Sequence, residues 1–257
     1  MNRVLVTLIL LTVCTFAFAQ DTPPITNKPN LSPGGSAMLP KLLSANPTAN
    51  EIASVLENAG NGTVEPMRVV QELIAGGSSL VPVLADVIAP DSLVPPSQPG
   101  DSGKVRRPAL ANRVLLIYAL DGIGSADAYS TIMRIGAPHP DAEIKGASMN
   151  ALVHTYLAKV RSGALKPDCE VVHALVARAD DPAFAKSLGR SVAWIAREGI
   201  RSWLNWDLGV FIRFQYKTVV NAVAITMPSA QYWEYWWSQN KPKIAWADNL
   251  GRFSIAN

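Results

Sequence analysis

The feature that most constrains the fold is a stripe of apolar residues at the three-and-four spacing of an α-helix. Leu110, Val114, Ile117 and Leu120 lie on one face of such a helix. The Gly-rich segment 121–124 ends the stripe, because glycine adopts the left-handed backbone conformation that terminates helices. A helix that is apolar along one face buries that face against another element. This region therefore predicts the first helix of an antiparallel pair.

The partner helix is predicted to follow directly. Ser125 is placed to cap it, and Tyr129, Ile132 and Met133 form its inner face. Further helical patterns are found at 52–56, 65–75, 79–89, 141–155, 172–179 and from Pro182 onwards. The second helices begin near residues 79, 126 and 169, which is a spacing of roughly 45 residues and within the range of helical repeats.

One family resemblance is carried by the stretch from Arg113 to Gly124 and by the residues Ser125-Ala126-Asp127-Ala128 after it. This stretch resembles a HEAT-like (PBS-lyase-type) repeat, in which a Gly-rich turn separates two helices and an acidic residue opens the second. The resemblance covers residues 106–135 best and continues more weakly over 141–200, where the Gly-rich turn after Val160 is absent. A lyase activity would rest on analogy alone.

The resemblance implies an all-α fold, an irregular α-solenoid of about eight to eleven helices in antiparallel pairs. A compact irregular helical bundle is the alternative. The best candidate for a strand is Thr218 to Met227, which contains several β-branched residues. We expect a helix there too, since its spacing also suits a helix and its surroundings are helical.

The first 19 residues have the pattern of a secretory signal peptide. The basic start at Arg3 precedes an apolar run from Val4 to Val13, and the exit Ala17-Phe18-Ala19 consists mainly of small residues. The apolar run is shorter than a membrane span requires. A lipid-bearing N-terminus at Cys14 is a less favoured alternative, because Val13 is bulkier than the residue such sites carry. We therefore expect export to the periplasm or the cell exterior.

The rest of the chain is expected to contain a flexible Pro-rich leader at 20–40, one helical domain at 41–240 and a C-terminal tail at 241–257. A Pro/Gly-rich loop at 90–104 interrupts the domain. Once the signal peptide is removed, Cys169 is the only remaining thiol, so no internal disulfide is expected. No membrane span is expected in the mature chain.

All seven tryptophans lie between Trp194 and Trp246, and five of the seven residues from Gln231 to Trp237 are aromatic. On a helix, Trp233, Trp236 and Trp237 share a face. The segment resembles the Trp-rich terminal helix that caps exported HEAT-like proteins, with Trp203, Trp206, Phe211 and Phe214 as its expected partners. The alternative is an exposed aromatic platform for a sugar ring or for a partner protein.

The sequence contains no motif that indicates catalysis. His139, His154 and His173 lack the spacing of metal ligands, and no Gly-x-Ser-x-Gly elbow or dinucleotide fingerprint is present. Cys169 opens a helix, where the helix dipole lowers a thiol pKa, but a lone thiol in a helical core is more often inert. No catalytic residue, metal or cofactor is therefore expected.

The formal net charge is only +3 and the two signs are interspersed, which argues against a nucleic-acid partner. The favoured hypothesis is an exported, non-catalytic scaffold that binds a protein through the second helices and turns, at Tyr129, Arg134, His173 and Arg178. One alternative is a glycan or cell-wall binding protein that uses Tyr232, Trp233 and Trp236. An enzyme is the second alternative.

Overall fold

The computed structural model describes residues 41–90, 108–204, 217–220, 223–226 and 229–255, with the backbone alone at 110–111, 217–220, 223–226 and 229–233. The chain divides into two units, Met1–Leu39 and Pro40–Asn257, and all described residues belong to the second. The predicted signal peptide, the leader at 20–40 and residues 91–104 of the predicted loop lie outside the described residues. Trp206, Phe211 and Phe214 also lie outside them.

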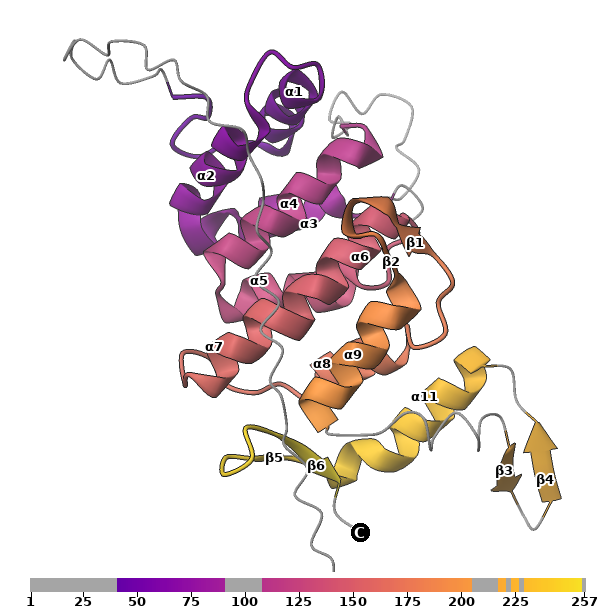
Figure 1. Cartoon of the computed structure of the whole chain (residues 1–257). Helices are drawn as coiled ribbons and strands as arrows, with labels where there is room; N and C mark the ends of the chain where they lie inside the picture. Colours follow the sequence, from indigo (N-terminus) through magenta and orange to yellow (C-terminus); the bar gives the residue numbers. More distant parts are fainter. Residues whose placement is uncertain (1–40, 91–107, 205–216, 221–222, 227–228, 256–257) are drawn as a thin grey trace, which may run out of the picture. The chain divides into compact units, whose positions relative to one another are not determined.

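The described part of the chain is mainly helical (Figure 1). Its longer helices are α1 (Ala49–Gly60), α2 (Pro66–Gly76), α3 (Val81–Ile88), α4 (Leu110–Ile123), α5 (Ala126–Thr131), α6 (Ala142–Ala151), α7 (Leu157–Arg161), α8 (Glu170–Val176), α9 (Val192–Leu204) and α11 (Ser229–Asn240). Short helical turns precede, follow or connect these elements, namely η1 (Gly77–Leu80), η3 (Ile132–Gly136), η4 (Leu152–Tyr156), η5 (Lys186–Leu188) and η6 (Lys241–Lys243).

The helix boundaries near the resemblance follow the predicted capping chemistry. Gly124 ends α4 in the left-handed conformation, with φ of 64°. The hydroxyl of Ser125 accepts a hydrogen bond from the N–H of Ala128 at 3.2 Å and so caps α5. The carboxylate of Asp141 accepts from the N–H groups of Glu143 and Ile144 and caps α6. The predicted helix pair over residues 110–133 is therefore confirmed.

Neighbouring helices share one continuous core. Helix α4 packs against α2 and α6, α6 packs against α9, and α9 packs against α8. The buried faces carry the residues that the helical spacing selected, including Ile52, Val70, Leu120, Ile132 and Leu175. The core thus runs through the successive helices, and α8 packs against η3, the continuation of α5.

The helix predicted for Thr218 to Met227 is wrong. Strands β3 (Lys217–Val220) and β4 (Val223–Thr226) form an antiparallel hairpin in which Val220 pairs with Val223. The β-branched residues of both strands favour an extended backbone, because their side chains restrict the χ1 rotation that a helix requires. Local propensity therefore outweighs the helical surroundings here.

The helix predicted to start at Pro182 begins ten residues later, at Val192 of α9. The intervening segment forms the short hairpin of β1 (Phe184–Ala185) and β2 (Arg190–Ser191), with η5 between the strands. The backbone of Gly146 in α6 lies so close to Ala185 that a Cβ atom would clash with it. The extended strand fits this narrow space, in which a helix of larger diameter would not.

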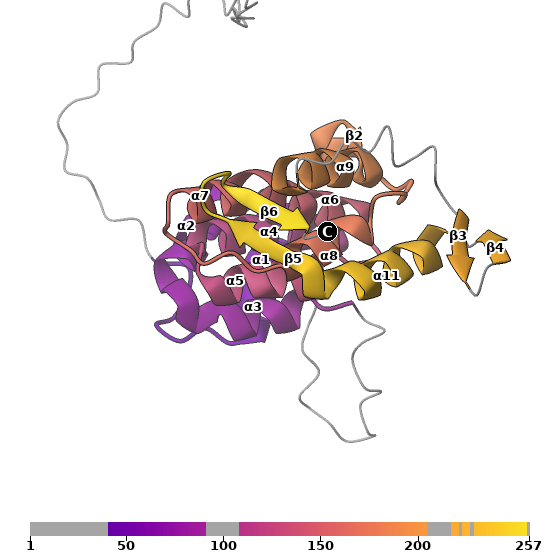
Figure 2. The same cartoon turned by 90° about the horizontal axis from the view of Figure 1, so that it is seen from below.

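The predicted C-terminal tail at 241–257 belongs instead to the folded unit. Strands β5 (Ile244–Ala247) and β6 (Arg252–Ile255) form an antiparallel hairpin in which Trp246 pairs with Phe253 (Figure 2). Both rings lie against the buried Trp203 of α9, with ring centroids 6.1 and 5.8 Å from it. Two aromatic residues at matching positions of a hairpin bury enough apolar surface to hold this segment on the core.

Among the described residues, one continuous helical stretch, Pro66–Ile88, is long and apolar enough to cross a membrane by length and composition alone. It comprises α2, η1 and α3, and its residues Val69, Leu73 and Leu84 are buried in the core. Core helices of soluble proteins satisfy the same criterion, so this stretch is weak evidence for a span.

His139 is an ionisable residue in the core. Its side chain is 1% exposed, and its Nδ1 accepts a hydrogen bond from the N–H of Asp141 at 3.0 Å. Its Nε2 is buried without a hydrogen-bond partner in the described structure. Burial lowers the pKa of His139, and nearby Arg113 and Lys145 lower it further, against an opposing effect of Asp141. The folded state therefore holds this imidazole neutral.

We predict that the His139→Asn variant loses part of the acid sensitivity of the protein. The unfolded chain binds a proton on His139 near pH 6.5 whereas the folded chain resists it, so stability falls as the pH drops below about 6.5. Asparagine retains an acceptor for the N–H of Asp141 but does not titrate. Urea unfolding at pH 5.0 and 7.5 measures the change, with the exposed His154→Asn as control. Equal pH dependence in wild type and His139→Asn would contradict the assignment.

Candidate binding groove beside helix α8

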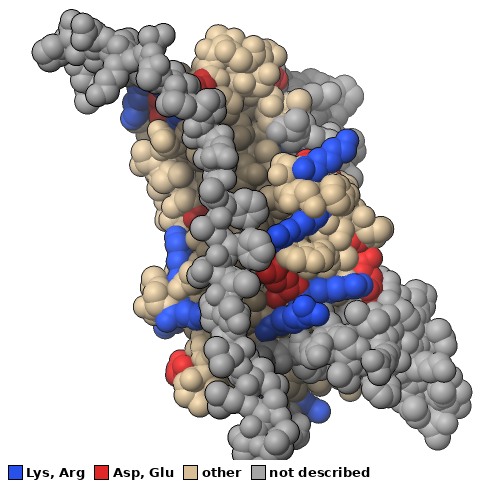
Figure 3. Space-filling view, viewed as in Figure 1, with Lys and Arg blue, Asp and Glu red and all other residues tan. Residues whose placement is uncertain are grey.

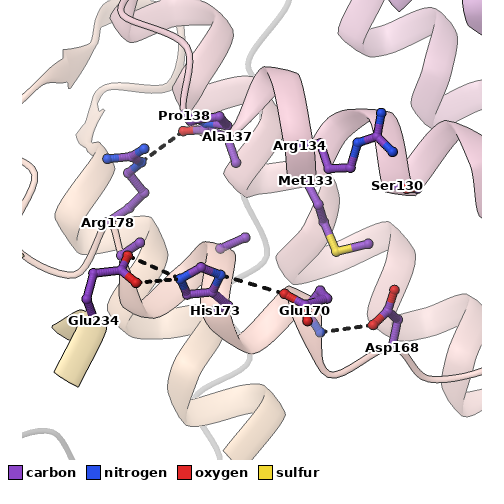
Figure 4. Close-up of a pocket in the computed structure, with 12 residues that line it drawn as sticks. Ser130, Met133, Arg134, Ala137, Pro138, Asp168, Glu170, His173, Arg178 and Glu234 are labelled. Atoms are coloured by element: carbon purple, nitrogen blue, oxygen red, sulfur yellow. Dashed lines mark hydrogen bonds and ion pairs between the residues drawn. The ribbon is translucent and has the colours of Figure 1, made fainter. Parts of the chain in front are cut away.

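The described residues form an open cavity of about 470 Å³ beside α8 (Figure 4). This volume lies in the range of roughly 300–1,000 Å³ that ligand sites occupy. It is lined from α5 and η3, from the turn that follows η3, from α8 and its flanking turns, and from α11. Its lining residues are Ser130, Met133, Arg134, Ala137, Pro138, Asp168, Glu170, His173, Ala174, Ala177, Arg178 and Glu234. We call this cavity the α8 groove.

The wall formed by η3 has an unusual backbone. Residues Ile132–Gly136 form a π-helical turn that continues α5. Such a turn inserts an extra residue into the helix and changes the direction of the side chains that follow. Here Ile132 and Met133 remain in the core, whereas Arg134 is exposed at the groove.

The second arginine of the groove is held by the backbone. Nε of Arg178 donates to the carbonyl oxygen of Ala137 at 3.0 Å, which ties the end of α8 to the turn after η3. No hydrogen-bond partner of its two terminal nitrogens is found among the described residues. Arg134 likewise has no hydrogen-bond or ion-pair partner there. Both guanidinium groups are therefore able to donate to a ligand.

The carboxylates of the groove already have partners. His173 Nε2 lies 3.2 Å from both oxygens of Glu234, and its Nδ1 lies 3.6 Å from an oxygen of Glu170 (Figure 4). The ammonium group of Lys241 also donates a hydrogen bond to Glu170 at 2.6 Å. One oxygen of Asp168 accepts from the N–H of Glu170 at 3.0 Å. Two of the three carboxylates are thus engaged by side chains, Glu170 by Lys241 and His173, and Glu234 by His173.

Helix α11 is attached to this wall through aromatic contacts. The ring of Trp237 stacks on His173 with a centroid distance of 4.9 Å and an interplanar angle of 8°. The ammonium group of Lys241 lies 5.6 Å from the same indole ring. Glu234 reaches the groove from this helix, so the packing of Trp237 positions one of the lining residues.

Three of the seven residues predicted to bind a partner, Arg134, His173 and Arg178, line the same groove. Tyr129 does not: it lies on the inner face of its helix, where the helical spacing also placed it, and is not accessible to a partner as the binding hypothesis requires. Its ring is completely buried against Tyr156, and its hydroxyl donates to Asp121 at 2.8 Å. Burial and the charge of Asp121 raise the pKa of this hydroxyl well above its ordinary value. Tyr129 therefore stabilises the helix pair.

Of the three aromatic residues predicted to bind on the C-terminal helix, the structure describes only the side chain of Trp236. Trp236 is only 7% exposed, and Trp237 is buried beside it. This leaves little of the Trp236 ring for a ligand, as expected for a residue that covers the core. The backbone of α11 contains Tyr232 and Trp233, but their side chains lie outside what the structure describes.

The groove also contains residues that sequence reasoning did not select. Asp168, Glu170 and Glu234 line it, and Met133 forms part of its apolar floor. Glu170 and His173 are three residues apart on one helix, a spacing that places them on the same face. That spacing is a signal that could have identified Glu170. Glu234 reaches His173 across 61 residues of sequence, which no local pattern indicates.

Cys169 lies at the start of α8 but lacks the environment of a reactive thiol. Burial raises its pKa, and the charges of Glu170 and Asp168 raise it further. These effects outweigh the helix dipole that would lower the pKa. The thiol is therefore held in its protonated, weakly nucleophilic form.

Within the described ranges, no group of three or more His, Cys, Asp or Glu side chains is arranged to hold a metal ion. On the face shown in Figure 3, basic and acidic side chains are interspersed.

Comparisons of the chain with family models, with curated proteins and with solved structures found no match.

Proposed function

We propose that the protein is an exported, non-catalytic scaffold that binds a partner protein through the α8 groove. The observation that carries this proposal is the convergence of Arg134, His173 and Arg178, from two consecutive second helices and their turns, on one apolar-floored cavity. Arginine and exposed apolar surface are enriched in protein interfaces. The export depends on the signal-peptide pattern of the first 19 residues.

The proposed architecture is an irregular α-solenoid of HEAT-like helix pairs. Successive pairs in such a stack place their second helices side by side on one face. The contacts of α8 with η3, the continuation of α5, support this arrangement. The groove then corresponds to the space between two second helices, which is where a solenoid offers an elongated binding surface.

The glycan-binding alternative has weaker support. It requires exposed aromatic faces, whereas Trp236 and Trp237 are buried and Trp237 is stacked on His173. The enzyme alternative has no observation in its favour among the described groove residues: Ser130 and His173 both line the groove, but no hydrogen bond joins them. The interaction scaffold accounts for the groove without further assumptions.

We predict that Arg134→Glu abolishes capture of the partner. The tagged full chain is expressed in its native host, crosslinked and purified from the envelope fraction. Reversal of an exposed charge at the groove should reduce the captured protein by about tenfold or more. Arg201→Glu, an equally exposed arginine of α9 outside the groove, is the matched control.

The outcomes separate the proposed functions. Capture that depends on Arg134 and not on Arg201 supports the scaffold. Equal capture by both variants places the partner elsewhere and contradicts the proposal. Retention on wall polysaccharide that is lost in Trp236→Ala would replace it with glycan binding.

A further inference from the structure

The α8 groove has an excess of available positive hydrogen-bond donors. Arg134 has no partner among the described residues. Arg178 donates its Nε to the carbonyl of Ala137, and its charge also acts on Asp181, whose pKa it helps to lower. By contrast, Glu170 is paired with Lys241 and His173, and Glu234 with His173. The charges with unused hydrogen-bonding capacity are therefore mainly the two guanidinium groups, which match carboxylates in geometry.

The surface beside these arginines is apolar and lined by small residues. Met133 is nearly buried, Ala174 and Ala177 are half-buried on the α8 side, and Ala137 and Pro138 complete the floor. Figure 4 shows Arg134 beside Met133, and Arg178 beside Ala137 and Pro138. Short alanine side chains leave space that an aliphatic side chain can fill.

From these two features we propose that the α8 groove binds an extended peptide segment in which a carboxylate side chain stands next to an aliphatic one. The carboxylate binds Arg134. Arg178 lies across the groove beside Ala137 and Pro138 (Figure 4) and is available to another acceptor of the peptide, such as a backbone carbonyl. The aliphatic side chain lies on the floor between Met133 and Ala177. This inference rests on the proposed scaffold function and names the chemistry that its partner presents.

The surrounding acids restrict the charge of such a peptide. Asp168 is exposed and has one carboxylate oxygen without a partner in the described structure. It disfavours a ligand that carries negative charge along its whole length, because like charges repel across a groove of mixed polarity. A segment with one carboxylate and a neutral or basic flank fits this pattern.

The test uses the full chain and defined peptides with blocked ends. The probe is fluorescein-labelled Ala-Glu-Leu-Ala-Lys, and its two analogues carry Gln or Lys in place of Glu. Fluorescence anisotropy at low salt measures the Kd of each peptide. We expect the Glu peptide to bind about tenfold or more tightly than the Gln peptide, and the Lys peptide not to bind. Raising the salt concentration should weaken binding of the Glu peptide.

Two variants test the two halves of the site. Arg134→Gln removes the charge and should abolish the preference for Glu over Gln. Ala177→Leu fills the floor and should weaken both peptides alike. Arg201→Gln, outside the groove, should leave every Kd unchanged. Thermal melts of all variants verify folding. Arg134 is exposed and Ala177 is half-buried, so neither substitution removes a core residue.

Binding that discriminates Glu from Gln only when Arg134 is present supports the proposal. No binding, or discrimination that persists in Arg134→Gln, overturns it. If the peptides fail while capture from the host still depends on Arg134, the ligand class is wrong and the scaffold function stands. If the peptides bind as expected but the host yields no Arg134-dependent partner, the peptide site stands and the scaffold function is contradicted.

Discussion

Replacing Trp203 with alanine is expected to lower the free energy of unfolding by about 3–5 kcal/mol, because it removes a large buried side chain and leaves a cavity. The side chain of Trp203 is completely buried in α9. Its ring centroid lies 5.3 Å from that of Tyr156 and 5.8 Å from that of Phe253. Its indole N–H donates to the carbonyl of Leu152 at 3.1 Å, and alanine would leave that buried acceptor unpaired.

Helix α9 offers a matched control for this substitution. Trp194 lies on the same helix but is 44% exposed, with Arg190 over its ring at 3.9 Å. Trp194→Ala removes the same number of atoms from a position that creates no cavity, so only a small change is expected. Urea unfolding of both variants measures the difference. A similar loss in both would show that Trp203 is not a centre of the core.

The effect of Trp203→Ala should extend to the end of the chain. The hairpin β5–β6 contacts α9 through Trp246 and Phe253, which both lie against Trp203. Without the indole ring, these two residues lose their main aromatic partner. Amide hydrogen exchange is therefore expected to increase in residues 244–255 more than in α1, which packs mainly against α2, α3 and α4.

Much of the helical framework was predictable because its signals are local. The apolar spacing of Val114, Ile117 and Leu120 identifies α4, and the caps at Ser125 and Asp141 fix the starts of α5 and α6. Such signals depend on residues within one or two turns of each other. None of the three hairpins was predicted. Residues 218–227 were the best strand candidate but were assigned to a helix, and the strands of the other two hairpins are only two or four residues long.

The groove was predictable only in part, for a similar reason. Arg134, His173 and Arg178 were selected because the helical period places them on second helices or in the turns after them, away from the core. The same period also placed Tyr129 on the inner face of its helix, and the structure buries it there with its hydroxyl on Asp121, although tyrosine suits both a core and a surface. The π-helical turn at Ile132–Gly136 and the approach of Glu234 depend on tertiary packing, so no local pattern indicates them.

Breaking the ion pair between Lys145 and Asp181 is expected to destabilise the fold strongly. The two groups lie 2.6 Å apart, and their side chains are only 10% and 13% exposed. Replacing Lys145 with methionine leaves the carboxylate of Asp181 largely buried without its main partner, which costs about 3–5 kcal/mol in comparable pairs. The remaining hydrogen bond from the N–H of Ala183 at 3.0 Å compensates only in part. Equilibrium unfolding at pH 7 measures the loss.

The pH dependence gives this prediction a second readout. Burial alone would raise the pKa of Asp181, but the hydrogen bonds from Lys145 and Ala183 lower it below its ordinary value. A lowered pKa in the folded state stabilises the protein above about pH 4, and that contribution disappears as the pH falls through the folded pKa. The stability difference between wild type and Lys145→Met should therefore shrink in acid.

The ion pair of Lys241 is a control for the effect of burial, because it has the same distance but a much more exposed position. Lys241 also lies 2.6 Å from a carboxylate, that of Glu170, but both side chains are far more exposed, at 51% and 41%. Water and salt screen such a pair, so Lys241→Met should change the stability little. If Lys145→Met were as mild as Lys241→Met, the Lys145–Asp181 pair would be a surface contact. A large loss at pH 7 that declines in acid, seen for Lys145 alone, identifies a buried ion pair that joins α6 to the turn before β1.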